Sequence, residues 1–166
     1  MKPRIKTDST ILGIIIISTF VLWGFRNLYS YPGWVEIFLK VAGLIAILEG
    51  NLLRMSARGH KKAHSKTSRQ LVVSGPYTLV RNPMYLGSFL MGLGFAILLW
   101  PWWLVIVFAI LFYMRFNIQM TKEEALLAEN FGKEYREYCA KVPRFFPPFR
   151  ILKARTLKRL LIFKRP

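Results

Sequence analysis

The sequence predicts an all-α integral membrane protein with about four transmembrane helices and a C-terminal amphipathic helix. Hydrophobic residues make up 54% of the 166 residues, more than the about 45–50% that is usual in soluble domains. These residues gather in runs close to the roughly 20 residues that a helix needs to cross a bilayer. The lysines and arginines fall mainly in blocks between the runs. A chain of this length is expected to form one domain, residues 1–166.

The first expected span is residues 10–28. The basic residues before it, Lys2, Arg4 and Lys6, would also suit the start of a secretory signal peptide. No small-x-small cleavage site follows the run, and residues 23–27 would make a poor one. We therefore favour an uncleaved span over a signal peptide.

The second expected span is residues 34–53, and it contains one acidic residue, Glu49. An acid at the centre of a membrane helix costs roughly 2.5–3.5 kcal/mol. Glu49 is only about a turn from Arg54 and the membrane boundary, so pairing or exposure there would relieve much of that cost. A position in the wall of a pocket remains an alternative.

Residues 74–87 join the second and third spans through two strong helix breakers, Gly75-Pro76 and Asn82-Pro83. Glycine tolerates a positive φ, and each proline fixes its own φ and restricts the residue before it. The breaks enclose or adjoin one arginine and two tyrosines. Irregular backbone at a membrane edge is tolerated where protein or water satisfies it. The segment is therefore expected to form a rigid turn beside a binding site.

The third and fourth expected spans are residues 85–99 and 102–118. They meet at the cluster of residues 100–103, which holds three tryptophans and a proline. This cluster predicts a tight helical hairpin with an aromatic belt at the water boundary.

The net charge of +17 is concentrated before residue 10, in residues 54–69 and in a basic tail, residues 150–166. The connections at residues 29–33 and 100–103 carry no charge. Because basic residues cluster on the cytoplasmic side of spans, four spans would place both termini and every basic block there. The charge is then explained by orientation and by attraction to anionic lipids. Nucleic-acid binding is disfavoured because no aromatic-basic pattern or nucleic-acid fold signal accompanies the charge.

The cysteine and histidine content gives little support for a disulfide or a metal site. Cys139 is the only cysteine, so no internal disulfide can form, and it lies in a segment expected on the reducing cytoplasmic side. His60 and His64 are four residues apart, but they lie among basic residues in an expected glycine-broken loop without a carboxylate. We predict no metal site.

Residues 121–141 predict a cytoplasmic amphipathic helix, and residues 121–138 hold five of the eight acidic residues. Its apolar residues recur at helical spacing. They are Leu127, Phe131, Tyr135 and Tyr138. We expect the helix to lie against the membrane surface or against residues 75–87, and the prolines and aromatic residues of 142–149 to end it at the interface.

Glu123 and Glu124 have two interpretations. Thr121-x-x-Glu124 fits a capping box, and acids suit a helix N-terminus. Alternatively, the fourth span ends at the cytoplasmic edge, so that both carboxylates lie level with Tyr77 and Arg81 and accept hydrogen bonds from a ligand. The residues alone leave both interpretations open.

Two motifs in this order resemble a known family. The first is Gly-Pro-Tyr-x3-Arg-Asn-Pro-x-Tyr-x-Gly at residues 75–87, and the second is Glu-Glu-x2-Leu-x3-Phe-Gly-x2-Tyr-x2-Tyr-x3-Val-Pro at residues 123–143. Around a two-span hairpin they resemble the isoprenylcysteine carboxyl methyltransferases and the related phospholipid N-methyltransferases, small integral-membrane enzymes that use S-adenosylmethionine. The similarity covers roughly residues 67–149.

The resemblance implies a cofactor pocket capped by the segment before the third span and by the helix after the fourth. By position, the cofactor-binding residues would be Gln70, Leu71, Val72, Tyr77, Asn82, Pro83, Met84, Tyr85 and Glu123. We expect the catalytic residues to be Arg81, Tyr85 and Glu124.

Two positions depart from the isoprenylcysteine enzymes. Asn82 stands where many of them carry histidine, and asparagine cannot titrate. Gln119 stands where they use arginine near the substrate carboxylate, and Arg115, one turn earlier, is the candidate replacement. We expect Arg115 and Gln119 to contact the substrate.

The resemblance implies methyl transfer from S-adenosylmethionine to a lipid-like carboxylate. Transfer to a phospholipid amine would use the same cofactor site and is the first alternative. A sterol-reductase-like enzyme with a nicotinamide cofactor shares a similar Arg-x-Pro-x-Tyr-x-Gly stretch, and a non-catalytic membrane scaffold is a further option. The brevity of the chain favours methyl transfer over reduction of a bulky sterol.

Overall fold

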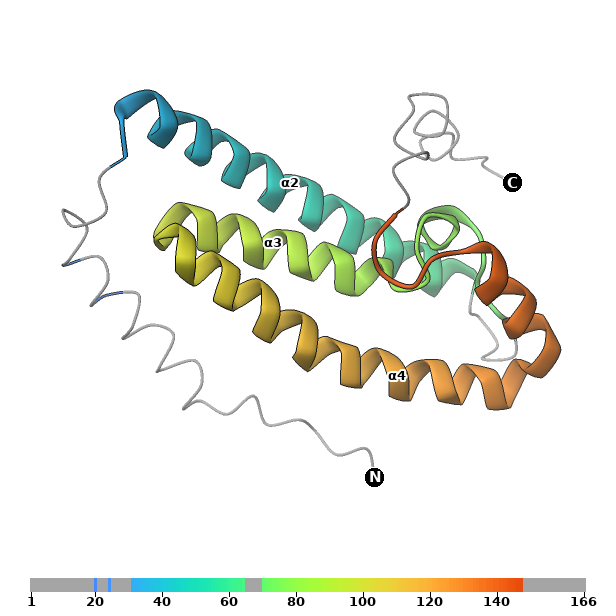
Figure 1. Ribbon diagram of the computed structural model, residues 1–166. Helices are drawn as coiled ribbons and strands as arrows, with labels where there is room; N and C mark the ends of the chain where they lie inside the picture. The colour runs from blue at the N-terminus through green and yellow to red at the C-terminus, as the bar shows by residue number, and fades with distance from the viewer. Residues whose placement is uncertain (1–19, 21–23, 25–30, 65–69, 148–166) are drawn as a thin grey trace.

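The computed structural model describes Phe20, Gly24 and residues 31–64 and 70–147, and the secondary structure of these residues is helical throughout (Figure 1). The elements are α2 (Gly33–His64), the 3-10 helix η2 (Gly75–Thr78), α3 (Pro83–Leu99) and α4 (Trp102–Lys141). Apart from Phe20 and Gly24, the first expected span at residues 10–28 lies outside the described residues, and so does the basic tail.

Helix α2 is longer than the expected span at residues 34–53, because it continues to His64. The prediction of a loop around His60 and His64 was wrong. Most residues beyond the span favour helix, and Gly59 costs only about 1 kcal/mol relative to alanine. The last turn is basic, which suits the negative end of the helix dipole.

Helices α2 and α3 run antiparallel and side by side (Figure 1), and two glycine pairs let their backbones approach closely. A methyl group on Gly50 would lie 2.6 Å from the Gly87 carbonyl oxygen, and one on Gly94 would lie 2.5 Å from the Gly43 carbonyl oxygen. Small residues at such contacts are typical of helix packing in membranes.

The hairpin between α3 and α4 is confirmed: α3 ends at Leu99, and α4 begins at Trp102. Aromatic rings fill the space between the two helices. Phe112 stacks on Phe116 with ring centroids 4.1 Å apart, and Phe89 of α3 lies 5.4 Å from Phe112. The Tyr85 ring in the first turn of α3 lies 5.2 Å from the Phe116 ring, so the start of α3 lies beside the middle of α4.

Helix α4 does not break where the fourth span was expected to end. Residues 102–118 and 121–141 belong to one helix, because no glycine or proline interrupts the join and Gln119, Met120 and Lys122 favour helix. Thr121 lies inside the helix and donates from its Oγ1 to the Asn117 carbonyl oxygen at 2.9 Å. The capping-box interpretation of Thr121 and Glu124 was therefore wrong.

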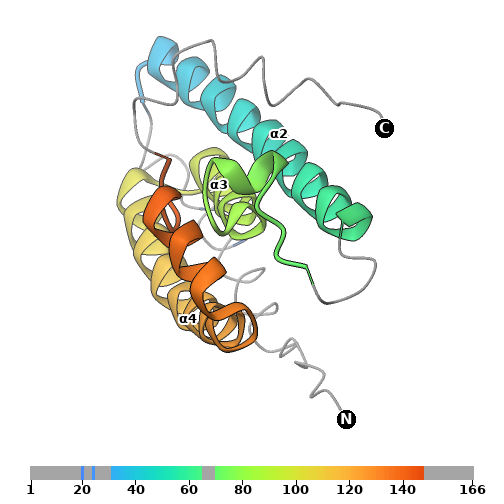
Figure 2. The same cartoon turned by 90° about the vertical axis from the view of Figure 1, so that its right-hand side faces the viewer.

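The helix instead bends at Gly132, whose φ of 46° and ψ of −110° favour glycine. The turns after the bend fold back toward η2 (Figure 2). There the Tyr138 hydroxyl donates to the Tyr77 carbonyl oxygen at 2.7 Å. Of the two placements expected for this amphipathic segment, the structure therefore has the one against residues 75–87.

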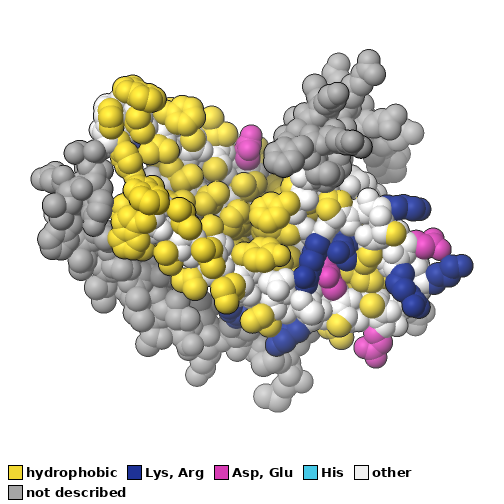
Figure 3. All heavy atoms as spheres, in the orientation of Figure 1, with side chains coloured by type: hydrophobic (Ala, Val, Ile, Leu, Met, Phe, Trp, Pro, Cys, Tyr) yellow, Lys and Arg dark blue, Asp and Glu magenta, His cyan; other side chains and the backbone are white. Residues whose placement is uncertain are grey.

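Helix α4 is, among the described residues, the one helix that is long and apolar enough to cross a membrane. Helix α3 is apolar but shorter, with 17 residues. Exposed hydrophobic side chains cover the hairpin end of the face in Figure 3, whereas Lys, Arg, Asp and Glu gather toward the other end. A small core closes the charged end and consists of Val80, Leu86, Met120 and Phe145.

Candidate functional site

A cavity of about 260 Å³ lies between residues 70–82 and the C-terminal half of α4. Seven residues of the expected site line it, namely Gln70, Leu71, Val72, Tyr77, Arg81, Asn82 and Glu124. Six further residues complete the wall, and these are Lys61, Leu127, Asn130, Phe131, Tyr135 and Tyr138. Five of these six belong to α4, on both sides of the bend at Gly132, so the bend helps to close the cavity.

The irregular segment that lines the cavity is fixed by local contacts, as its glycines and prolines predict. Gly75 has a φ of 62°, and Thr78 donates from its Oγ1 to the Gly75 carbonyl oxygen at 2.8 Å. His60 Nε2 and Ser74 Oγ are hydrogen-bonded at 2.8 Å, which ties the end of α2 to this turn. These hydrogen bonds therefore fix the backbone that carries Tyr77 and Arg81.

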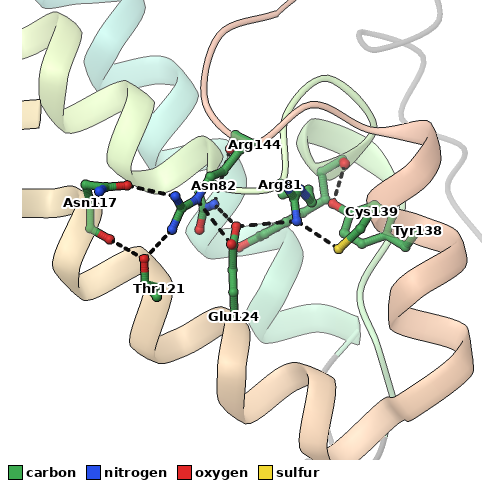
Figure 4. A network of polar contacts seen from close by, with 9 residues as sticks. Arg81, Asn82, Asn117, Thr121, Glu124, Tyr138, Cys139 and Arg144 are labelled. Carbon is green, nitrogen blue, oxygen red and sulfur yellow. Dashed lines mark hydrogen bonds and ion pairs between the residues drawn. The ribbon is translucent and has the colours of Figure 1, made fainter.

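Glu124 is the centre of a polar network at the cavity wall (Figure 4). Asn82 Nδ2 donates to Glu124 Oε1 at 2.9 Å, and Arg81 Nη1 lies 3.6 Å from the same oxygen. Arg144 Nε lies 3.1 Å from Glu124 Oε2. The side chains of Arg81 and Glu124 are each 17% exposed, so these charges are largely screened from water and paired with one another.

Two guanidinium groups around one carboxylate leave a local excess of positive charge. Arg81 Nη1 also donates to Cys139 Sγ at 2.8 Å, and three buried donors lack a hydrogen-bond partner among the described residues, namely Arg81 Nε, Arg144 Nε and the Tyr135 hydroxyl. An unpaired buried donor is costly, and a ligand that accepts from it would remove that cost. The arrangement suits an anionic group of a ligand.

Arg144 belongs to the polar network but was not identified from the sequence. Its Nη1 donates to Asn117 Oδ1 at 2.7 Å, and its Nη2 donates to Thr121 Oγ1 at 2.6 Å. The sequence had indicated only that residues 142–149 end the helix at an interface. The only sequence signal for Arg144 was an arginine placed between Val-Pro and Phe-Phe. Its side-chain partners Asn117, Thr121 and Glu124 lie at least 20 residues earlier, so the sequence did not connect them with it.

Glu123 is not among the residues that line this cavity and belongs to a second cluster between α3 and α4. The Tyr85 hydroxyl donates to Glu123 Oε1 at 2.6 Å, and Gln119 Nε2 donates to the same oxygen at 3.4 Å. Adjacent helical residues point about 100° apart, which separates Glu123 from Glu124. Arg115 is exposed on the same helix.

The remaining expected residues lie outside both groups. Pro83 is fully buried in the first turn of α3, and Met84 follows it; neither lines the described cavity. Glu49 is exposed on α2 and does not line that cavity either. Glu123 and Tyr85 thus form a cluster beside the cavity around Glu124, close enough for Glu123 to raise the pKa of Tyr77 in the cavity wall.

Comparison with known proteins identifies the family. The profile of the family described as "Phospholipid methyltransferase" matches residues 38–134, more than half of the chain. The chain belongs to this family. The match runs from the first turns of α2 to just beyond the bend at Gly132. It includes Glu123, Glu124 and the segment at residues 75–87.

Curated relatives agree with this membership. The chain is 35% identical over 133 residues to a protein-S-isoprenylcysteine O-methyltransferase of Schizosaccharomyces pombe, covering 73% of the chain and 56% of the relative. It is 33% identical over 126 residues to the Xenopus laevis enzyme of that name, covering 70% and 44%. The Homo sapiens enzyme is 28% identical over 143 residues, covering 81% and 50%. The chain thus spans about half the length of the curated relatives it matches.

Tyr77 and Tyr138, which line the cavity, are neutral phenols. Burial, and secondarily Glu123, raises the pKa of Tyr77 to about 12. Burial, and secondarily Tyr135, raises the pKa of Tyr138, whose hydroxyl is already used as a donor. At neutral pH these rings therefore offer uncharged aromatic faces and hydroxyl groups to a ligand.

Proposed function

We propose that this chain is a membrane methyltransferase that uses S-adenosylmethionine and methylates a lipid-like substrate, with an isoprenylcysteine carboxylate as the acceptor. The observation that carries the proposal is the cavity whose wall contains Arg81, Asn82 and Glu124. Family membership and the printed names of the relatives support the reaction and the acceptor.

The chemistry of the cavity wall fits this cofactor. A carboxylate and neutral aromatic rings favour the ammonium and sulfonium groups, because the faces of such rings attract cations. Arg81 and Lys61 supply positive charge for its carboxylate. The cavity of about 260 Å³ is just below the about 300–1,000 Å³ typical of small-molecule sites. Modest opening would therefore accommodate the whole molecule.

When bound, S-adenosylmethionine supplies a methyl group that its positive sulfur has already activated. The chain then has to align the acceptor and exclude water. Glu124, which accepts a hydrogen bond from Asn82, would bind the cofactor from the cavity wall. The turns of α4 after Gly132 would cover the cofactor. A carboxylate acceptor needs no general base, which suits a wall in which Asn82 occupies a position that cannot titrate.

The membrane arrangement is part of the proposal. We infer about four spans, with both termini and the charged end of the helices facing the cytoplasm, where the cofactor is dissolved. The basic end of α2 would contact anionic lipid headgroups. The lipid-like substrate would approach from the bilayer beside the aromatic rings of α3 and α4, where Arg115 and Gln119 lie near its polar group.

Transfer to a phospholipid amine is the second candidate, and one contact favours it. An amine must lose a proton after methylation, and Glu123 is a carboxylate hydrogen-bonded by Tyr85 at 2.6 Å. This pair could receive that proton. The family match favours either methyl transfer over a nicotinamide-dependent reduction.

Isotope-labelled S-adenosylmethionine distinguishes the two acceptors. Purified protein is incubated with an S-prenylated N-acetylcysteine or with phosphatidylethanolamine, and the lipid fraction is treated with base. A methyl ester releases labelled methanol, whereas an N-methyl group is retained. We expect base-labile label, with Arg81→Gln reducing it and exposed Arg136→Gln leaving it unchanged. Binding of NADPH but not of S-adenosylhomocysteine in calorimetry would overturn the proposal.

A further inference from the structure

Arg144 joins the segment after α4 to three successive turns of that helix. Its guanidinium contacts Asn117 Oδ1 at 2.7 Å, Thr121 Oγ1 at 2.6 Å and Glu124 Oε2 at 3.1 Å. A planar guanidinium can satisfy several acceptors at fixed angles, whereas a lysine ammonium acts as a flexible point charge. The geometry therefore depends on arginine and not only on positive charge.

The backbone of the same segment is held independently of the Arg144 side chain. The Arg81 N–H donates to the Pro143 carbonyl oxygen at 2.8 Å, and Asn82 Nδ2 lies 3.2 Å from the Arg144 carbonyl oxygen. Phe145 is only 3% exposed and belongs to the small core. A substitution of the Arg144 side chain therefore leaves these anchors in place.

The Arg144 side chain contacts the cavity-lining residue Glu124 but is not itself among the lining residues. Asn82 and Glu124 line the cavity, whereas the lining does not include Arg144. Glu124 Oε1 faces Asn82 and Arg81, and its Oε2 faces Arg144. Without Arg144, Oε2 would lose its nearest cation, and the carboxylate could turn further toward Arg81 at 3.6 Å.

We propose that Arg144 is a positioning residue that fixes the Glu124 carboxylate in the orientation that binds S-adenosylmethionine. The inference rests on the proposed function, because it assumes that the cavity is the cofactor site. Preorganised groups bind more tightly because less freedom is lost on binding. Loss of Arg144 should therefore weaken binding without any loss of direct contact with the cofactor.

Calorimetry with S-adenosylhomocysteine in detergent tests the inference. Arg144→Gln and Arg144→Lys should each lower the affinity on the order of 10-fold, about the cost of ordering one side chain on binding. Exposed Arg136→Gln, the matched control, should bind like the wild type. In turnover assays the KM for S-adenosylmethionine should rise more than kcat falls. Arg144→Lys keeps the positive charge, so its affinity tests the inference even if Arg144→Gln does not fold.

A double-mutant cycle separates positioning from general support of the fold. If Arg144 acts through Glu124, Arg144→Gln should add no further loss of affinity in a Glu124→Gln background. Additive losses, or wild-type affinity in both Arg144 variants, would overturn the inference while leaving the proposed function intact. A wild-type protein that fails to bind S-adenosylhomocysteine would overturn the proposed function, and this inference with it.

Discussion

The Tyr85 hydroxyl donates a 2.6 Å hydrogen bond to the Glu123 carboxylate, which ties the first turn of α3 to the middle of α4. The next residue, Glu124, turns away from this pair and is bound by Asn82 and two arginines. Two acids adjacent in the sequence therefore have separate environments, one between helices and one in the cavity wall.

This separation predicts different effects of neutralising the two acids. Glu124→Gln removes the charge from the cavity wall and should lower affinity for S-adenosylhomocysteine on the order of 10- to 100-fold. Glu123→Gln should change that affinity by less than about 3-fold, because Glu123 does not line the described cavity. Calorimetry of both variants checks this, and a reversed order would place the cofactor beside Tyr85 instead.

The glycine contacts between α2 and α3 predict a large loss of stability from a single methyl group. Gly50→Ala places that group 2.6 Å from backbone atoms of α3, so the helices must separate. We expect a loss of about 1–3 kcal/mol, typical of overpacking. Gly59→Ala in the same helix is the control, since nothing lies within 4 Å there, and it should stabilise by up to about 1 kcal/mol. Denaturant unfolding in detergent compares the two; equal effects would rule out the close packing.

Features set by local sequence were predicted well. The hairpin at residues 100–101 follows from a proline between two apolar runs, and the rigid turn at residues 75–83 follows from its glycine and prolines. The continuity of α4 was missed because the sequence changes there from apolar to charged residues. Such a change means that the helix passes from an apolar to a polar environment, and it does not end the helix.

Features that depend on partners far apart in the sequence were not predicted. The pairing of Gly50 with Gly87 and the contact of Arg144 with Glu124 exist only after the helices have been placed in space. The bend at Gly132 was also missed, because a glycine inside a helical pattern is compatible with an unbroken helix. The resemblance to the family supplied candidate residues for the site but not the hydrogen bonds that hold Glu123 and Glu124.

The raised pKa values of the cavity tyrosines predict a loss of stability in alkali. Burial raises the pKa of Tyr77 to about 12, above its ordinary value of 10.0, so the folded state favours the neutral phenol. Its contribution is therefore complete below about pH 10 and is lost as the pH rises toward about 12. Denaturant unfolding across this range should show falling stability, and Tyr77→Phe should fall less steeply. Identical slopes would show that another group controls the alkaline transition.

The inferred orientation predicts that the two ends of the described helices face opposite sides of the membrane. The basic end of α2 carries exposed Lys62, and the hairpin carries exposed Trp102. Since basic residues stay on the cytoplasmic side, a cysteine at position 62 should be protected in intact cells from a membrane-impermeant maleimide. A cysteine at position 102 should react from outside. Both are placed in a Cys139→Ser background, and permeabilised cells should label position 62 as a control for reactivity. Labelling of position 62 but not 102 in intact cells would invert the orientation and would place the cavity on the side away from the cofactor.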